Sequence, residues 1–263
     1  MAAYYNEFDP VAAQWLRNLI YAGLIPDGDV DSRSITEVTP NDISGYTQCH
    51  FFAGLGIWPL ALRLAGWGDD KHVWTGSCPC QPFSSGGKGE GFADERHLWP
   101  YFHYLIQQRR PTVVFGEQVA SKAGLVWFDL VQADLESEGY AATAFDLCAA
   151  GAGAPHIRQR LFWVGDTCHP GAQGVRGCEQ IIHPERREDA VGHSVSAALD
   201  SPVWSAWESD KGADSRLRML PRNFVADANG HTGRVGRLRA YGNAIVPQVA
   251  VKFIQSYMSC TGV

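Results

Sequence analysis

The sequence has no long apolar run. No stretch approaches the roughly 20 apolar residues that cross a bilayer, and no basic segment follows Met1 as in a signal peptide. Charged residues make up 19% and hydrophobic residues 45% of the 263 residues, a composition typical of a folded globular protein. We therefore expect a soluble, cytoplasmic, monomeric protein without a membrane partner, with one main domain and a smaller lobe.

The number of cysteines is odd. Seven are scattered along a chain too large to depend on disulfides, so their thiols should stay reduced and available for chemistry. A zinc site built from Cys168, His169, Cys178 and His183 is an alternative, but their spacing matches no common zinc motif. We expect no bound metal.

Basic charge is scarce overall but unevenly distributed. The net charge is −6, yet residues 156–240 hold 12 Lys and Arg against 10 Asp and Glu. Within 216–239 there are six arginines and a single acidic residue, Asp227. Because a polyanion responds to the local field, a basic lobe on an acidic body remains compatible with a nucleic-acid partner.

Strand and helix patterns alternate along most of the chain. Asp9 and Pro10 predict the start of a first helix that ends before Gly23. The apolar run 49–52 predicts a buried strand, the glycine-rich turn 53–56 follows it, and a helix runs from Pro59 to about Gly66. Further strands are expected at 72–76, 112–115 and 161–164, and helices at 99–108, 124–138 and 241–258.

This alternation favours an α/β fold with a doubly wound, mostly parallel sheet. Between Asp166 and about Gly236 the periodicity fades into Gly, Pro, His and Arg. We therefore expect an N-terminal helical extension over 1–45, a catalytic domain over 46–165 and 236–263, and a small irregular lobe over 166–235.

Three segments carry candidate chemistry. Cys80 lies in Ser77-Cys78-Pro79-Cys80-Gln81-Pro82-Phe83-Ser84, just after a predicted strand, where reacting groups of open α/β sheets gather. A structural cysteine or a metal-binding pair are the alternatives. Glu117 follows the next strand, although a solvated loop residue is the commoner role. Arg158 and Arg160 would point the same way, as phosphate or base contacts need, although surface decoration is the default.

Together these segments resemble the DNA (cytosine-5)-methyltransferase family. Six motifs occur in the family's order, over about 50–165 and 236–258. They are Phe52-Ala53-Gly54-Leu55-Gly56, Pro79-Cys80-Gln81-Pro82-Phe83-Ser84, Asp94-Glu95-Arg96-His97-Leu98-Trp99, Glu117-Gln118-Val119, Arg158-Gln159-Arg160 and Tyr241-Gly242-Asn243-Ala244-Ile245-Val246-Pro247.

The resemblance implies a Rossmann-like domain that binds S-adenosylmethionine and methylates cytosine in double-stranded DNA. It implies that Cys80 attacks C6 of a flipped cytosine, while Glu117, its pKa raised by burial, protonates N3 and Arg160 lies near the base. It assigns cofactor contacts to Phe52, Ala53, Gly54, Leu55, Gly56, Ser77, Pro79, Asn243, Ala244 and Ile245. DNA contacts fall to Gln81, Ser84, Ser85, Lys88, Arg158, Arg234 and Arg237.

One departure from the family concerns the cofactor. Only about two dozen residues separate the glycine loop from Cys80, where the family normally fits two further βα units that contact the ribose and adenine. Either the N-terminal extension folds over to replace them, or the pocket is open and weak. Candidate ribose ligands are Asp27, Asp29, Asp31, Asp69 and Asp70. In addition, Gln118 replaces the usual Asn and His156 the usual Gln.

Three functions remain open at this point. The first is an active DNA methyltransferase, either the partner of a restriction enzyme or a phage enzyme that masks its genome. The second is the same chemistry on a tRNA cytosine. The third is a catalytically silent DNA-binding relative, which the joint presence of Cys80, Glu117 and Arg160 argues against.

Overall fold

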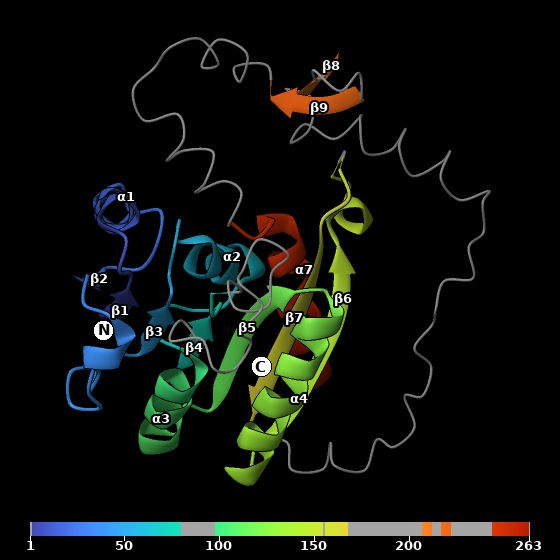
Figure 1. Ribbon diagram of the computed structural model, residues 1–263. Coiled ribbons are helices and arrows are strands. Elements are labelled where there is room, and N and C mark those ends of the chain that lie inside the picture. Colours follow the sequence, from blue (N-terminus) through green and yellow to red (C-terminus); the bar gives the residue numbers. More distant parts are fainter. Residues whose placement is uncertain are drawn as a thin grey trace. The chain divides into compact units, whose positions relative to one another are not determined.

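The larger part of the described chain is built on a seven-stranded sheet (Figure 1). The computed structural model describes residues 2–79, 98–154, 156–167, 207–211, 217–221 and 244–262. The strands of the sheet are β1 (Ala3–Asn6), β2 (Gly28–Asp31), β3 (Gln48–Phe51), β4 (Val73–Gly76), β5 (Val113–Val119), β6 (Ala141–Cys148) and β7 (Gln159–Asp166). The main helices are α1 (Pro10–Tyr21), α2 (Ile57–Ala65), α3 (Trp99–Arg109), α4 (Lys122–Ser137) and α7 (Pro247–Thr261).

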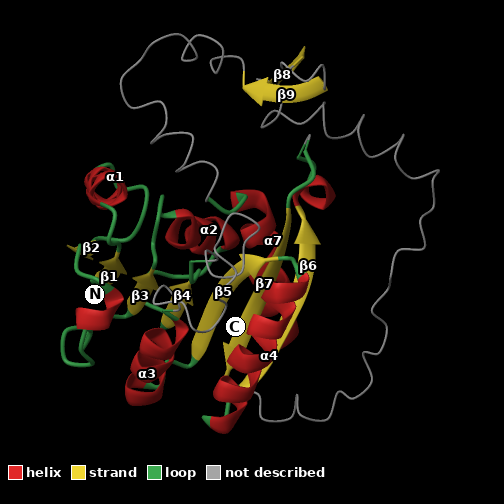
Figure 2. Cartoon of the chain, in the orientation of Figure 1, coloured by secondary structure: helices red, strands yellow, loops and turns green. Residues whose placement is uncertain are grey.

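The strand order is β2-β1-β3-β4-β5-β7-β6. The strands from β2 to β5 pair in parallel, and β7 pairs antiparallel with β5. Helices cover both sides of the sheet (Figure 2). The expected doubly wound, mostly parallel α/β fold is therefore confirmed.

Side chains alternate between the two faces of the sheet, as extended strands require. On one face, Phe51, Trp74 and Trp163 join Trp99, Phe102 and Trp127 of α3 and α4 in the main core. On the other face, Phe115 of β5 packs its ring edge-on against Phe253 and Tyr257 of α7. This second face also carries α1 and α2. Glu117 of β5 and Arg160 of β7 lie on the same face.

The predicted helix ends are confirmed where local capping decides them. The Asp9 side chain accepts from the backbone N–H groups of Val11 and Ala12, so α1 begins at Pro10. Gly66 ends α2 in the left-handed conformation. For the last helix, expected over 241–258, residues 244–246 are not helical and the helix begins at Pro247, because proline favours the first turn. Residues 241–243 lie outside the described residues.

The N-terminal region is not the purely helical extension expected over 1–45. It forms a β-α-β unit, and β1 and β2 extend the central sheet beyond β3. A Cβ atom on Gly28 would lie 1.9 Å from the carbonyl oxygen of Ala3, so only glycine lets β2 pair at that point. All four residues of β1 are buried, so the strand shows no alternation by which it could be recognised.

Several other bounds differ from the expectation. The strands β5 and β7 are longer than predicted, and β6 was not predicted. The chain divides into two compact units: residues 1–147, 159–176 and 244–263 form one, and 148–158 and 177–243 form the other. In the second unit, β8 (Trp207–Lys211) and β9 (Leu217–Pro221) form an antiparallel pair. Most of the lobe expected at 166–235 lies outside the described residues, so its bounds stay a prediction.

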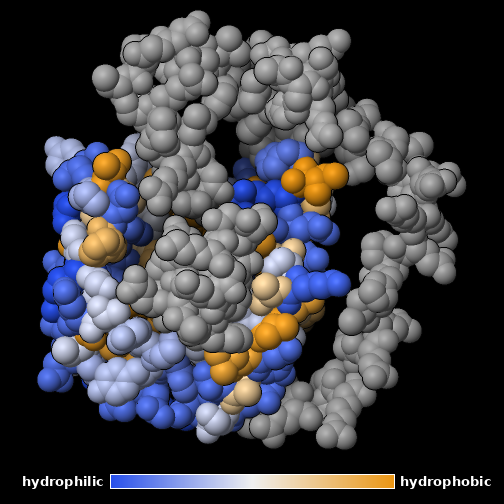
Figure 3. Space-filling view, viewed as in Figure 1, coloured by the Kyte–Doolittle hydropathy of each residue, from blue (hydrophilic) through white to orange (hydrophobic). Residues whose placement is uncertain are grey.

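Among the described helices, none is long and apolar enough to span a membrane. On the face shown in Figure 3, the described surface is mostly hydrophilic, and hydrophobic residues form small separate patches.

Candidate active site

One edge of the sheet collects the candidate functional residues. The strands β1, β3, β4 and β5 are parallel, so the residues at and beyond their carboxyl ends lie along the same edge. The antiparallel β7 starts at this edge. The edge therefore brings together Glu7, the glycine loop 52–56, the segment 77–79, Glu117 and Arg160.

The glycine loop has a shape that its sequence makes possible. Phe52, Gly54 and Gly56 have positive φ angles of 51°, 54° and 73°. A Cβ on Gly56 would also approach a Leu16 methyl group to 3.0 Å. Gly56 caps α2 without a side-chain hydrogen bond, so the backbone N–H groups of Ile57 and Trp58 in the first turn have no capping side chain. Such a helix start suits the carboxylate of a ligand.

Glu7 lies against this loop and was not among the predicted site residues. Its Oε2 accepts a hydrogen bond from the Gly54 N–H at 2.7 Å, and its Oε1 accepts one from the Asp9 N–H at 2.8 Å. The Ala53 N–H donates to the carbonyl of Asn6 at 3.0 Å. The end of β1 and the glycine loop are thus joined by two hydrogen bonds.

The segment 77–79 follows β4 and leads to Cys80 in the sequence. The indole Nε1 of Trp58 donates to Ser77 Oγ at 3.0 Å, which fixes the start of the segment. The Cys78 side chain is buried, and burial raises the pKa of its thiol, so it stays neutral. Pro79 is exposed. Cys80 and the expected contacts Gln81, Ser84, Ser85, Lys88, Arg234, Arg237 and Asn243 lie outside the described residues.

Glu117 and Arg160 form an ion pair between β5 and β7. Arg160 Nε lies 2.9 Å from Glu117 Oε1, and the carboxylate side chain is 10% exposed. In the antiparallel register Glu117 faces Phe162, so Arg160 is its diagonal neighbour on the same face. The Arg160 Nη1 also donates to the carbonyl of Gln159 at 2.8 Å. Two residues that were predicted separately are therefore brought into direct contact.

Four further residues singled out in the sequence are Ala244, Ile245, Arg158 and His156. Ala244 and the buried Ile245 precede α7, which the Tyr257 hydroxyl ties to Asp166 of β7 at 2.8 Å. Arg158 belongs to the second unit, where its carbonyl accepts from the Ala149 N–H. In that unit, burial and the nearby Arg158 charge lower the pKa of His156.

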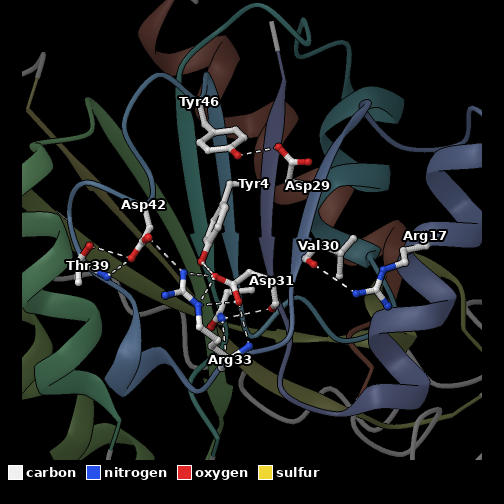
Figure 4. Close-up of polar contacts among 10 residues, drawn as sticks. Tyr4, Arg17, Asp29, Val30, Asp31, Arg33, Thr39, Asp42 and Tyr46 are labelled. Carbon is white, nitrogen blue, oxygen red and sulfur yellow. Dashed lines mark hydrogen bonds and ion pairs between the residues drawn. The ribbon is translucent and has the colours of Figure 1, made fainter.

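Three of the five expected ribose ligands, Asp29, Asp31 and Asp69, accept hydrogen bonds or form ion pairs with other side chains. Figure 4 shows Asp31 accepting from Arg33 and the Tyr4 hydroxyl, while Asp29 accepts from the Tyr46 hydroxyl at 2.7 Å. Although partial burial alone would raise it, these hydrogen bonds hold the pKa of Asp31 below its usual value. Asp69 forms an ion pair with Arg63 at 2.7 Å.

Comparison with known proteins finds one matching family model. The family model described as C-5 cytosine-specific DNA methylase matches residues 66–189. Over these residues the chain is similar to this family. It is 33% identical over 113 residues to the Type II methyltransferase M.AluI of Cellulosimicrobium cellulans, covering 38% of this chain and 22% of that protein. It is 26% identical over 167 residues to the Type II methyltransferase M.HhaI of Haemophilus parahaemolyticus, covering 49% and 51%.

Solved structures give a weaker likeness. A crystal structure of a Spodoptera frugiperda DNMT2 mutant matches with a TM-score of 0.39 and 17% identity, covering 63% of this chain and 50% of that one. The chain spans about half or less of the length of these family members.

Proposed function

We propose that this chain is a DNA (cytosine-5)-methyltransferase that acts on double-stranded DNA through a covalent bond between Cys80 and C6 of a flipped cytosine. The observation that carries the proposal is the Glu117–Arg160 pair, held between β5 and β7 at the same edge as the glycine loop and the segment leading to Cys80. A carboxyl and a guanidinium in this arrangement suit the edge of a neutral nitrogen heterocycle.

The residues present fit S-adenosylmethionine. The first turn of α2, which begins after Gly56 without a side-chain cap, suits the ligand's carboxylate, and the loop 52–56 lets its backbone approach closely. Ser77, Pro79, Asn243, Ala244 and Ile245 are the other proposed contacts. When bound, the cofactor would supply an electrophilic methyl group, and Cys80, Glu117 and Arg160 would act on the cytosine ring.

The proposed steps use three side chains. The Cys80 thiolate adds to C6 while Glu117 donates a proton to N3, so C5 becomes the nucleophilic carbon of an enamine. Arg160 orients the Glu117 carboxyl, as their contact at 2.9 Å supports. After C5 is methylated, a base removes the C5 proton, the bond between Cys80 and C6 breaks, and Glu117 recovers its proton.

The proposed DNA contacts add charge near the flipped base. Gln81, Ser84, Ser85, Lys88 and Arg158 would contact DNA around the pocket, and Arg234 and Arg237 would do so from the basic region 216–239. We propose a cytoplasmic monomer that acts either beside a restriction enzyme or in protecting a phage genome.

Labelled S-adenosylmethionine, incubated separately with duplex DNA and with tRNA, tests the proposal. We expect label in 5-methylcytosine of DNA alone. Label in tRNA would favour the alternative function, methylation of a tRNA cytosine. Glu117→Gln should lower the turnover rate by about 100-fold or more, since a general acid typically contributes that much. Glu37→Gln, an exposed residue that loses the same charge, serves as the control. DNA binding without any methyl transfer would indicate a catalytically silent relative.

A further inference from the structure

The N-terminal β-α-β unit lies beside β3, on the side of the sheet away from β4. The family normally fits two further βα units between the glycine loop and the nucleophile segment, and this chain lacks them. Between the glycine loop and Pro79 the chain forms α2 and β4, with no further strand. The positions beyond β3 are filled by β1 and then β2, both parallel to it. The unit expected after the glycine loop thus precedes it in the chain.

Glu7 lies at the carboxyl end of β1, the first strand of this unit. It directly follows β1, the immediate neighbour of β3, and it contacts the backbone of Gly54. In open α/β sheets that bind nucleosides, an acidic residue at this position accepts hydrogen bonds from the ribose. The sheet position, the contact with the loop and the residue type therefore agree.

The hydrogen-bonding capacity of Glu7 matches a diol. A carboxylate offers about four acceptor positions, two on each oxygen. Among the described residues, each oxygen of Glu7 accepts one backbone N–H, from Gly54 and Asp9 respectively, and no cation pairs with it. One position remains on each oxygen. Two neighbouring hydroxyl groups, each donating one O–H, would fill them.

Asp31, Asp29 and Asp69 are less well placed than Glu7. Both oxygens of Asp31 already accept from Arg33, and one also accepts from Tyr4 (Figure 4). Asp29 and Asp31 lie on the edge strand β2, two strands away from β3. Asp69 is paired with Arg63. Glu7 is the carboxylate among these that touches the glycine loop.

We propose that the N-terminal unit completes the cofactor site and that Glu7 accepts hydrogen bonds from both ribose hydroxyls. The inference rests on the proposed function, since it takes S-adenosylmethionine as the ligand. It replaces Asp27, Asp29 and Asp31 as the ribose ligand, and it explains how the chain can dispense with the two units after the loop.

Calorimetry with S-adenosylhomocysteine and its 2′,3′-dideoxy analogue tests this directly on the full chain. Glu7→Gln should weaken binding of S-adenosylhomocysteine by at least about tenfold, because a ribose hydroxyl loses its charged acceptor. The same substitution should leave the affinity for the dideoxy analogue unchanged within about twofold. Glu37→Gln, an exposed charge change in the same N-terminal region, should affect neither ligand.

The ratio between the two ligands distinguishes the outcomes. Both ligands meet the same folded fraction, so partial unfolding of the variant cancels in the ratio. Equal affinity of Glu7→Gln and wild type for S-adenosylhomocysteine would overturn the inference while leaving the proposed function intact. An equal loss for both ligands would show that Glu7 only holds the loop. Failure of the wild type to bind either ligand would remove the proposed function itself.

Discussion

Two cysteines, Cys78 and Cys80, stand two positions apart at the end of β4, and only one is proposed to react. Cys78 is 5% exposed, and burial raises the pKa of its thiol, so it packs as a small apolar group. Cys80→Ser should abolish methyl transfer, because a hydroxyl is a far poorer nucleophile at neutral pH. Cys78→Ser should keep activity and lose some stability. Labelled methyl transfer to DNA measures both, and reversed phenotypes would show that the nucleophile is misassigned.

His50 makes stability depend on pH. Its ring is fully buried in β3, stacks on Tyr5 and contacts Thr75 Oγ1 at 2.9 Å. Burial lowers the pKa of His50 to about 3, against about 6.5 in an unfolded chain. The unfolded state therefore binds a proton that the folded state does not, and stability falls as the pH drops below the unfolded value.

The expected loss from His50 is about 1.4 kcal/mol between about pH 7.5 and about pH 5.5. Urea denaturation at the two pH values measures it. His50→Gln should lose that much of the pH dependence, whereas His72→Gln, at an exposed position, should behave like the wild type. An identical pH dependence in His50→Gln and wild type would contradict the assignment.

Among the elements, those with local end signals were predictable from sequence. The Asp9 cap and Gly66 mark helix ends through contacts within a few residues, so α1 and α2 were found close to their observed bounds. The strands β1 and β2 were missed because their place in the sheet depends on distant pairing, and β2, with one glycine and two aspartates, has few residues that favour strands. Glu7 was missed for the same reason, since its contact with Gly54 spans 47 positions of the chain.

The N-terminal unit should be indispensable to the sheet. Tyr5 of β1, Leu16 of α1 and Ile25 are fully or almost fully buried in one cluster, and removing each large apolar group typically costs about 2–5 kcal/mol. Deleting residues 1–45 should therefore abolish cooperative unfolding, followed by circular dichroism during a urea titration. A truncated protein that unfolds cooperatively at the wild-type midpoint would show that the unit is an appendage.

At the scale of the whole molecule, the order of elements in space differs from their order in the chain. The glycine loop follows β3, the third strand in sequence. In the sheet β3 lies between β1 and β4, so residues from both neighbouring strands can lie beside the loop. Glu7 comes from one side, and the segment 77–79 and Glu117 come from the other. The motifs themselves were recognisable from sequence, whereas the contact between Glu117 and Arg160 and the role of the N-terminal unit required the sheet register.

The most direct measurement of the proposed chemistry is trapping on duplex DNA in which 5-fluorocytosine replaces cytosine. Fluorine cannot leave C5 as a proton does, so the bond between Cys80 and C6 cannot be broken once the methyl group has been transferred. We expect a covalent protein–DNA adduct that forms only with S-adenosylmethionine and that peptide mass spectrometry assigns to Cys80. An adduct on another cysteine, or none with enzyme that methylates ordinary DNA, would contradict the account.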